Sequence, residues 1–157
     1  GLVVNRVSTS VLSNVLEVFQ DHPAGDLPVY IGGPVQQYFL FVLHSGLPDG
    51  NRSSQAQEPL PGVIFETDFD LLSDFFMHTW PDLEPEHRPV VHLFAGYSGW
   101  GPGQLENELE RSSWVVLPGS SDLIFSPKPE ESWENALRKK GGLYWVAAET
   151  GYKPSMN

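Results

Sequence analysis

Cysteine is absent from the chain, and so is any long apolar run. Without cysteine there can be no disulfide bond, zinc–thiolate site, iron–sulfur cluster or thiol nucleophile. Because disulfides are typical of oxidising compartments, a chain without them is expected in the cytoplasm. No apolar stretch approaches the ~20 residues that a membrane-spanning helix needs, so no membrane partner is expected.

Basic residues are also scarce. Nine Lys and Arg stand against 20 Asp and Glu, which gives a formal net charge of −11. A surface of this charge repels phosphate backbones, which argues against nucleic acid as a partner. The one basic cluster, Arg138, Lys139 and Lys140, lies near a predicted helix end, where cations interact favourably with the helix dipole.

The apolar content is nevertheless that of a folded protein, since 40% of the 157 residues are hydrophobic and 12% are aromatic. This length suits one domain with a substantial core, and we expect a single domain over residues 1–157. Short apolar runs predict strands at residues 2–5, 29–31, 39–44, 63–65, 90–95 and 114–117, with a further apolar stub at 123–125. The run at 39–44 is apolar on both faces, which predicts a central strand.

Helical periodicity predicts helices at about residues 8–19, 68–76, 102–111 and 130–140. The first two begin at a capping side chain, which is Ser8 or Ser10 in one and Asp68 or Asp70 in the other. Helices and strands interleave irregularly, and a hairpin is expected at Gly32-Gly33. We therefore expect an α+β fold with a mixed, largely antiparallel β-sheet and helices packed on it.

A glycine-rich turn between the strand at 90–95 and the helix at 102–111 is the most distinctive segment. The sequence from Gly96 to Gln104 reads Gly-Tyr-Ser-Gly-Trp-Gly-Pro-Gly-Gln, with four glycines within eight residues. Such density implies positive φ, or backbone packed closely against another segment. In the helix that follows, Gln104 and Glu108 lie four residues apart, so their polar ends can meet and tie the turn down.

This turn, extended to Leu109, resembles the signature of the bacterial AlgH/YqgE family. Three further segments match the family in order: Gly1 to Arg6; Gly32-Gly33-Pro34 with Val42-Leu43-His44; and Trp114 followed by Leu123-Ile124-Phe125 and Trp133. The resemblance implies an α+β fold and a cytosolic bacterial protein, with no accepted reaction. The family carries a label of transcriptional regulator through alginate control. Its members normally have two strands before the position of Leu2, which this sequence lacks.

A glycine-rich turn before a helix can bind phosphate through backbone amides. Here no Lys or Arg lies between Arg88 and Arg111. Glu106 and Glu108 also place negative charge at the helix start, where they repel an anion. Phosphate binding is therefore disfavoured.

Ser98 leaves open a serine-dependent hydrolase, because strand, Gly-x-Ser, turn and helix follow in the order of a nucleophile elbow. His44 or His92 can supply the base. Trp100 stands where that motif requires a glycine, so we favour a non-enzymatic protein. The five histidines show no close ligand spacing, and neither a metal nor a cofactor is expected.

The favoured interpretation is an uncharacterised cytoplasmic protein, a non-enzymatic binding or regulatory module that acts through the Gly96–Gln104 turn. Its partner is expected to be a protein or a small molecule, and a transcriptional regulator would act by protein contact rather than DNA contact. Trp114 and Trp133 are expected in the core. The candidate binding surface comprises Gly32, Gly33, Pro34, His44, Gly96, Tyr97, Ser98, Gly99, Trp100, Gly103, Gln104 and Glu108.

The net charge yields a first prediction. A regulator that contacts DNA directly should bind a generic duplex at low salt and lose affinity steeply as salt rises. We expect no binding by this chain even at low salt, measured by fluorescence anisotropy of a labelled duplex. Salt-dependent binding under these conditions would contradict the protein-contact interpretation.

Overall fold

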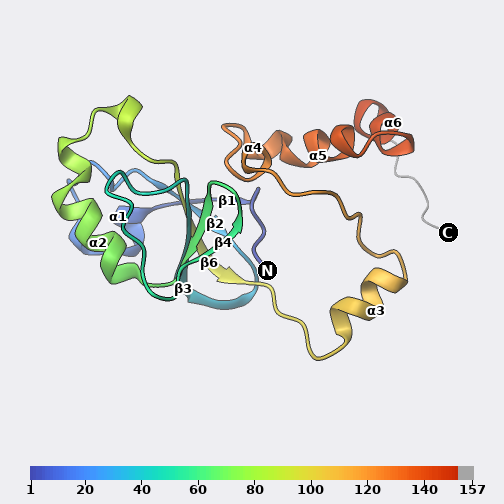
Figure 1. Cartoon of the computed structure of the whole chain (residues 1–157), viewed down its shortest axis with the longest axis horizontal. Coiled ribbons are helices and arrows are strands. Elements are labelled where there is room, and N and C mark those ends of the chain that lie inside the picture. The colour runs from blue at the N-terminus through green and yellow to red at the C-terminus, as the bar shows by residue number, and fades with distance from the viewer. Residues whose placement is uncertain (152–157) are drawn as a thin grey trace. The chain divides into compact units, whose positions relative to one another are not determined.

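The chain divides into two compact units, residues 1–98 and a second unit that begins at Gly99. The computed structural model describes residues 1–151 (Figure 1). In this range the first unit contains every strand, and the second unit is helical. The predicted α+β class is confirmed. Within the same range, no helix has the length and apolar character needed to cross a membrane.

One six-stranded sheet organises the described residues of the first unit. Its strands, in spatial order, are β1 (Val7–Val11), β2 (Pro28–Ile31), β6 (Val91–Tyr97), β3 (Val35–His44), β5 (Val63–Glu66) and β4 (Gln57–Leu60). The β2–β6 pair is parallel and the other four pairs are antiparallel. The predicted mixed, largely antiparallel sheet is confirmed. The predicted central strand at 39–44 is confirmed too, since β3 lies between β6 and β5.

The hairpin predicted at Gly32-Gly33 is wrong, because β6 lies between β2 and β3. β2 runs parallel to β6, with Tyr30 opposite Phe94. β3 runs antiparallel to the other edge of β6, with Leu43 opposite His92. β6 takes the central place because it is buried on both faces, and a strand of that kind is more stable between two neighbours than at an edge.

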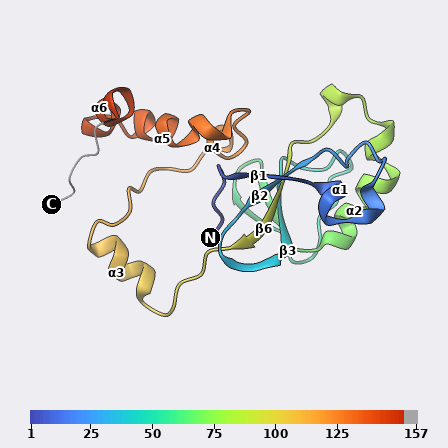
Figure 2. The same ribbon diagram turned by 180° about the vertical axis from the view of Figure 1, so that it is seen from behind.

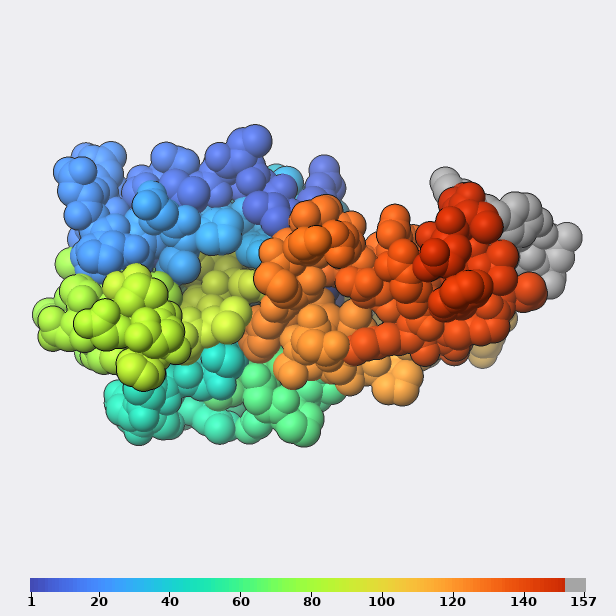
Figure 3. All heavy atoms as spheres, turned by 90° about the horizontal axis from the view of Figure 1, so that it is seen from above, coloured from blue at the N-terminus to red at the C-terminus, as the bar shows by residue number. Residues whose placement is uncertain are grey.

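Helices cover one face of this sheet, where the main core of the unit lies (Figures 1 and 2). They are α1 (Leu12–Val15), η1 (Glu17–Phe19), α2 (Phe69–His78) and η2 (Trp80–Asp82), with η3 (Pro85–His87) following. Phe76 meets Phe19 and Trp80 edge to face, with ring centroids 5.9 and 5.4 Å apart. Figure 3 shows the resulting contact between the yellow-green residues of α2 and the blue N-terminal part of the chain.

Two predictions about the start of the first unit are wrong. Residues 2–5 form no strand, although the Val3 amide donates to the Gly32 carbonyl at 2.8 Å. Residues 8–19 form β1, α1 and η1 instead of one helix. Ser8 does not cap a helix, because its hydroxyl donates to the Val29 carbonyl of the neighbouring strand at 2.6 Å. Strand pairing thus outweighs the local helical pattern.

The predicted start of α2 is confirmed. Asp68 is the N-cap, and its carboxylate accepts hydrogen bonds from the amides of Asp70 and Leu71. Leu72, Phe75 and Phe76 are buried, as the helical spacing predicts. Residues 57–60, for which no strand was predicted, form β4 at the edge of the sheet.

The described part of the second unit contains helices only. These are α3 (Gln104–Glu110), α4 (Ser121–Ile124), η4 (Pro129–Glu131), α5 (Ser132–Lys140) and α6 (Leu143–Thr150). The strand predicted at 114–117 is wrong, because these residues have no sheet neighbour in the described chain. α6 is an unpredicted helix, and it is tied to α5 by an ion pair between Arg138 and Glu149 at 2.7 Å.

A buried carboxylate links the long loop after β3 to the start of α2. Glu66 is 0% exposed. It accepts hydrogen bonds from the Ser53 amide and hydroxyl, at 3.0 and 2.5 Å, and from the amides of Thr67 and Asp68, at 2.9 and 3.0 Å. Burial by itself would raise the pKa of Glu66, but these hydrogen bonds together lower it.

We expect Glu66→Gln to lower the free energy of unfolding by roughly 2 kcal/mol, because an amide nitrogen would replace an acceptor oxygen facing these donors. The lowered pKa stabilises the fold at pH values above the pKa of the unfolded carboxyl group. This contribution is lost as the pH falls through the lower pKa of the folded state. Urea unfolding at about pH 7 and about pH 3 measures both effects.

The matched control is Glu86→Gln, since Glu86 is exposed and makes no hydrogen bond or ion pair with another described residue. It should unfold like the wild type. The gap between the wild type and Glu66→Gln should narrow at the lower pH. An equal gap at both values would contradict the role assigned to the Glu66 carboxylate.

Candidate functional site

The boundary between the two units falls inside the predicted Gly96–Gln104 turn, between Ser98 and Gly99. The candidate residues therefore divide into two groups. Gly32, Gly33, Pro34, His44, Gly96, Tyr97 and Ser98 belong to the first unit, and Gly99, Trp100, Gly103, Gln104 and Glu108 belong to the second. Each group is described within its own unit.

The glycines of the first group form a close crossing of two backbone segments. A Cβ on Gly33 would lie 2.1 Å from the carbonyl carbon of Tyr97, and one on Gly32 would lie 2.3 Å from the carbonyl oxygen of Gly96. Gly96 itself has a φ of +72°, in the left-handed region. The close packing and positive φ predicted from the glycine density are confirmed. The sheet requires glycine at these positions because a side chain there would overlap the neighbouring backbone.

His44 lies in the core of the first unit rather than on its surface. Its side chain is 0% exposed, and its Nδ1 accepts a hydrogen bond from the Gly46 amide at 3.2 Å. Burial lowers the pKa of His44 despite the nearby carboxylate of Glu66. The buried imidazole is therefore out of reach of a partner. Pro34, in contrast, is exposed.

In the second unit, one carboxylate accepts hydrogen bonds from side chains in and around the turn. Glu108 accepts hydrogen bonds from Nε1 of Trp100 at 3.1 Å, Nε1 of Trp114 at 2.8 Å and Nε2 of Gln104 at 3.0 Å. The Oε1 atom of Gln104 accepts in turn from the Gly101 amide at 3.1 Å. The predicted meeting of Gln104 and Glu108 is confirmed. We call Trp100, Gln104, Glu108 and Trp114 the tryptophan motif.

The two indole rings of this motif meet edge to face, with centroids 5.9 Å apart and planes at 67°. Trp133 is 59% exposed, so the prediction that it belongs to the core is wrong. The same prediction is wrong for Trp114, which is 47% exposed. Its indole N–H is nevertheless bound, and that bond is the main reason why the pKa of Glu108 is lowered. Gly99 and Gly103 are exposed, and Gly103 precedes α3 with a φ of +73°.

The elements of a serine hydrolase do not come together around Ser98. The amide and carbonyl of Ser98 both pair with the backbone of Gly1, at 2.8 Å. Between residues 1 and 151, no hydrogen bond joins the Ser98 hydroxyl to a histidine. His92 instead stacks on Tyr30, with centroids 4.6 Å apart, and burial lowers its pKa to about 4.

The described residues also do not form an evident anion site or metal site. The Gly101 amide, which a phosphate would need, is occupied by Gln104, and Glu106 lies in the first turn of α3. In the described part of the chain, no three or more His, Asp or Glu side chains are grouped to hold a metal ion.

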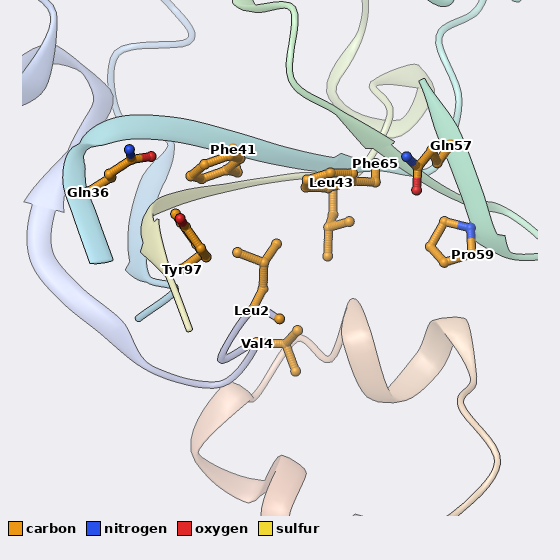
Figure 4. A pocket seen from close by; sticks show the side chains of 10 residues that line it. Leu2, Val4, Gln36, Phe41, Leu43, Gln57, Pro59, Phe65 and Tyr97 are labelled. Carbon is orange, nitrogen blue, oxygen red and sulfur yellow. The ribbon is translucent and has the colours of Figure 1, made fainter. Parts of the chain in front are cut away.

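A cavity of about 590 Å³ is lined by Phe41 and Leu43 (Figure 4), which alternate along β3 with the core residues Leu40 and Val42. Its lining includes Leu2 and Val4 from the N-terminal segment, and Phe41, Phe65 and Tyr97 from β3, β5 and β6. Leu43, Pro59 and the side chains of two glutamines, Gln36 and Gln57, complete the labelled lining. All these residues belong to the first unit.

A family model described as AlgH-like, DUF179, matches residues 1–145. The chain belongs to the AlgH-like family. A UPF0301 protein of Chlorobium phaeobacteroides is 33% identical over 157 residues, which are 100% of this chain and 78% of that protein. A UPF0301 protein of Chlorobaculum parvum is 36% identical over the same shares of the two chains.

Two solved structures resemble this AlgH-like chain. The solution structure of the AlgH protein from Pseudomonas aeruginosa has a TM-score of 0.67 at 31% identity, covering 98% of this chain and 78% of that one. The crystal structure of a Corynebacterium diphtheriae protein has a TM-score of 0.68 at 19% identity, covering 92% and 72%. The family resemblance seen in the sequence is confirmed.

Sequence reasoning missed two features of this AlgH-like chain, the cavity and the place of Trp114. The apolar residues on both faces of the strand at 39–44 were a signal for the cavity, because they indicate that each face of the sheet is shielded from water. Phe41 and Leu43 occupy the second face. Trp114 lies six residues after Glu108 and beyond the end of α3, so no helical spacing relates the two.

The close crossing predicts that Gly33→Ala will be strongly destabilising. The added methyl group would overlap backbone atoms of Tyr97 and Ser98, which cannot move without breaking the sheet. We expect a loss of about 3 kcal/mol in thermal or urea unfolding. Gly101→Ala is the control, because the nearest atom to its Cβ is Gln104 Oε1 at 3.9 Å. It should change stability by less than about 0.5 kcal/mol, and equal losses would contradict the packing role of Gly33.

Proposed function

We propose that this AlgH-like chain is a cytoplasmic, non-enzymatic binding or regulatory module that holds a protein partner through the tryptophan motif. The observation that carries the proposal is the exposed Trp114 indole, fixed by its 2.8 Å hydrogen bond to Glu108. The motif contains three residues of the predicted binding surface, Trp100, Gln104 and Glu108, and one residue, Trp114, that the prediction did not include.

Fixed aromatic side chains are efficient binding groups. Tryptophan is enriched among residues that dominate binding energy, because its large ring buries much apolar area in one contact. A partner that binds a free side chain must also immobilise it, which costs free energy. Here the Glu108 carboxylate and the edge-to-face contact with Trp100 already restrict the Trp114 ring. A partner therefore loses less binding free energy to immobilising the Trp114 ring than it would with a freely rotating side chain.

The charge of the motif indicates the kind of partner. Glu106 and Glu110 flank Glu108 along α3, and Arg111 is the next basic residue. The chain as a whole carries a net charge of −11. A protein surface with apolar and basic groups complements this arrangement, whereas a nucleic acid is repelled by it. Regulation by protein contact follows from the same argument.

The proposal predicts that Trp114→Ala and Gln104→Ala will weaken binding while the fold is retained. A partner would be cross-linked to the wild-type protein in a bacterial extract, identified by mass spectrometry, purified, and titrated by calorimetry. We expect Trp114→Ala to weaken the affinity by roughly tenfold or more, because an aromatic anchor is lost. Gln104→Ala should act more weakly, since it only loosens the Glu108 carboxylate.

Trp133→Ala is the matched control, because Trp133 is a similarly exposed tryptophan of the second unit outside the motif. It should bind as the wild type does. Circular dichroism of each variant separates binding from folding. If Trp114→Ala keeps full affinity, or if both motif variants unfold, the motif is architectural and the proposal fails.

A further inference from the structure

The cavity on the second face of the sheet is independent of the tryptophan motif, because its lining lies wholly within residues 1–98. We propose that it binds a neutral small molecule with a flat, largely apolar body and a hydrogen-bonding group at each end. Its volume of about 590 Å³ suits such a ligand, since sites for small molecules measure about 300–1,000 Å³.

The side chains of the lining favour an uncharged ligand. It contains no Asp, Glu, Lys, Arg or His side chain, although 18% of the chain is charged. A charged ligand would lose hydration on entry, and the ionised group of the lining, the Gly1 amine, already donates to the Ser98 carbonyl at 2.8 Å. An apolar body, in contrast, would gain from leaving water along Leu2, Val4 and Leu43.

The wall of the cavity favours a flat body. Phe41 and Phe65 come from neighbouring strands, and their ring planes differ by only 13° at a centroid distance of 6.2 Å. Tyr97 meets Phe41 edge to face at 5.6 Å. The three rings are carried by adjacent strands of the sheet, so their positions are fixed by backbone pairing. A planar ligand can stack on such a row with little rearrangement.

The ends of the cavity provide polar groups. Figure 4 shows Gln36 at one end of the aromatic row and Gln57 at the other. Neither side-chain amide hydrogen-bonds to another residue in the described chain, and each offers both donors and an acceptor. Gln36 also has a φ of +50°, which is rare outside glycine, at the point where the pairing of β3 with β6 loses its regular register. Backbone strain of this kind clusters at binding sites.

Two fluorescent probes with the same aromatic body test the charge rule. N-phenyl-1-naphthylamine is neutral, and 1-anilinonaphthalene-8-sulfonate carries one negative charge. We expect the neutral probe to bind the full chain with a Kd at least tenfold lower than the anionic probe, measured by the rise in probe emission on titration. Equal affinities would overturn the proposal, because they would indicate a site with no selection by charge.

Paired variants locate the bound probe. Val4→Trp places a large ring in the cavity and should abolish binding of N-phenyl-1-naphthylamine. Val3→Trp adds the same ring one residue earlier, at an exposed position outside the lining, and should leave binding unchanged. Leu143→Ser, which removes an exposed apolar side chain of the second unit, should also leave it unchanged. Binding that survives Val4→Trp, or that is lost in Leu143→Ser, overturns the proposal.

A second pair of probes tests the role of the glutamines. 2-Naphthamide and 2-methylnaphthalene differ in one hydrogen-bonding group, and we expect the wild type to prefer the amide by about fivefold in ligand-observed NMR titrations. Gln36→Leu or Gln57→Leu should remove this preference while keeping the affinity for 2-methylnaphthalene.

Sedimentation measures the oligomeric state of the wild type and of Val4→Trp. If Val4→Trp converts a dimer of the wild type into a monomer, the cavity is an interface between copies and the small-molecule proposal is wrong.

Discussion

The close approach of the backbone at Gly32-Gly33 to the end of β6 is the constraint on which the first unit depends. Because neither glycine has a side chain, the Gly32 amide reaches the Ala95 carbonyl at 3.0 Å, and β2 stays in register with β6. The chain then leaves β2 and returns as β3 on the far side of β6. The parallel β2–β6 pair and the place of β6 between β2 and β3 depend on this crossing.

A second consequence is that both faces of the central strands must be covered. Leu40 and Val42 of β3 point to the helices, and Phe41 and Leu43 point the other way. The helix face is filled by large side chains that meet edge to face. The opposite face retains a cavity with an aromatic wall. One strand therefore contributes to the core and to a candidate ligand site through alternate residues.

Interactions between residues close in the sequence could be predicted from it, whereas the pairing of strands far apart in the sequence could not. Asp68 caps α2, and Gln104 meets Glu108, because both interactions join residues within one helical turn. The place of β6 between β2 and β3 depends on residues about sixty positions apart, so the hairpin expected at Gly32-Gly33 was a reasonable but wrong inference. α6 escaped prediction because its first residues, Leu143 to Val146, are apolar and aromatic without helical spacing. The glycine density predicted close backbone packing, but the segments that meet there, the end of β2 and the end of β6, are far apart in the sequence.

The tryptophan motif has an optical consequence. Two indoles whose centroids lie 5.9 Å apart, with planes inclined at 67°, couple their electronic transitions. Such a pair absorbs left and right circularly polarised light unequally, which gives two circular dichroism bands of opposite sign that an isolated tryptophan lacks. The Glu108 carboxylate, by holding both N–H groups, keeps this geometry uniform from molecule to molecule. The chain thus contains a label-free reporter of the segment around α3.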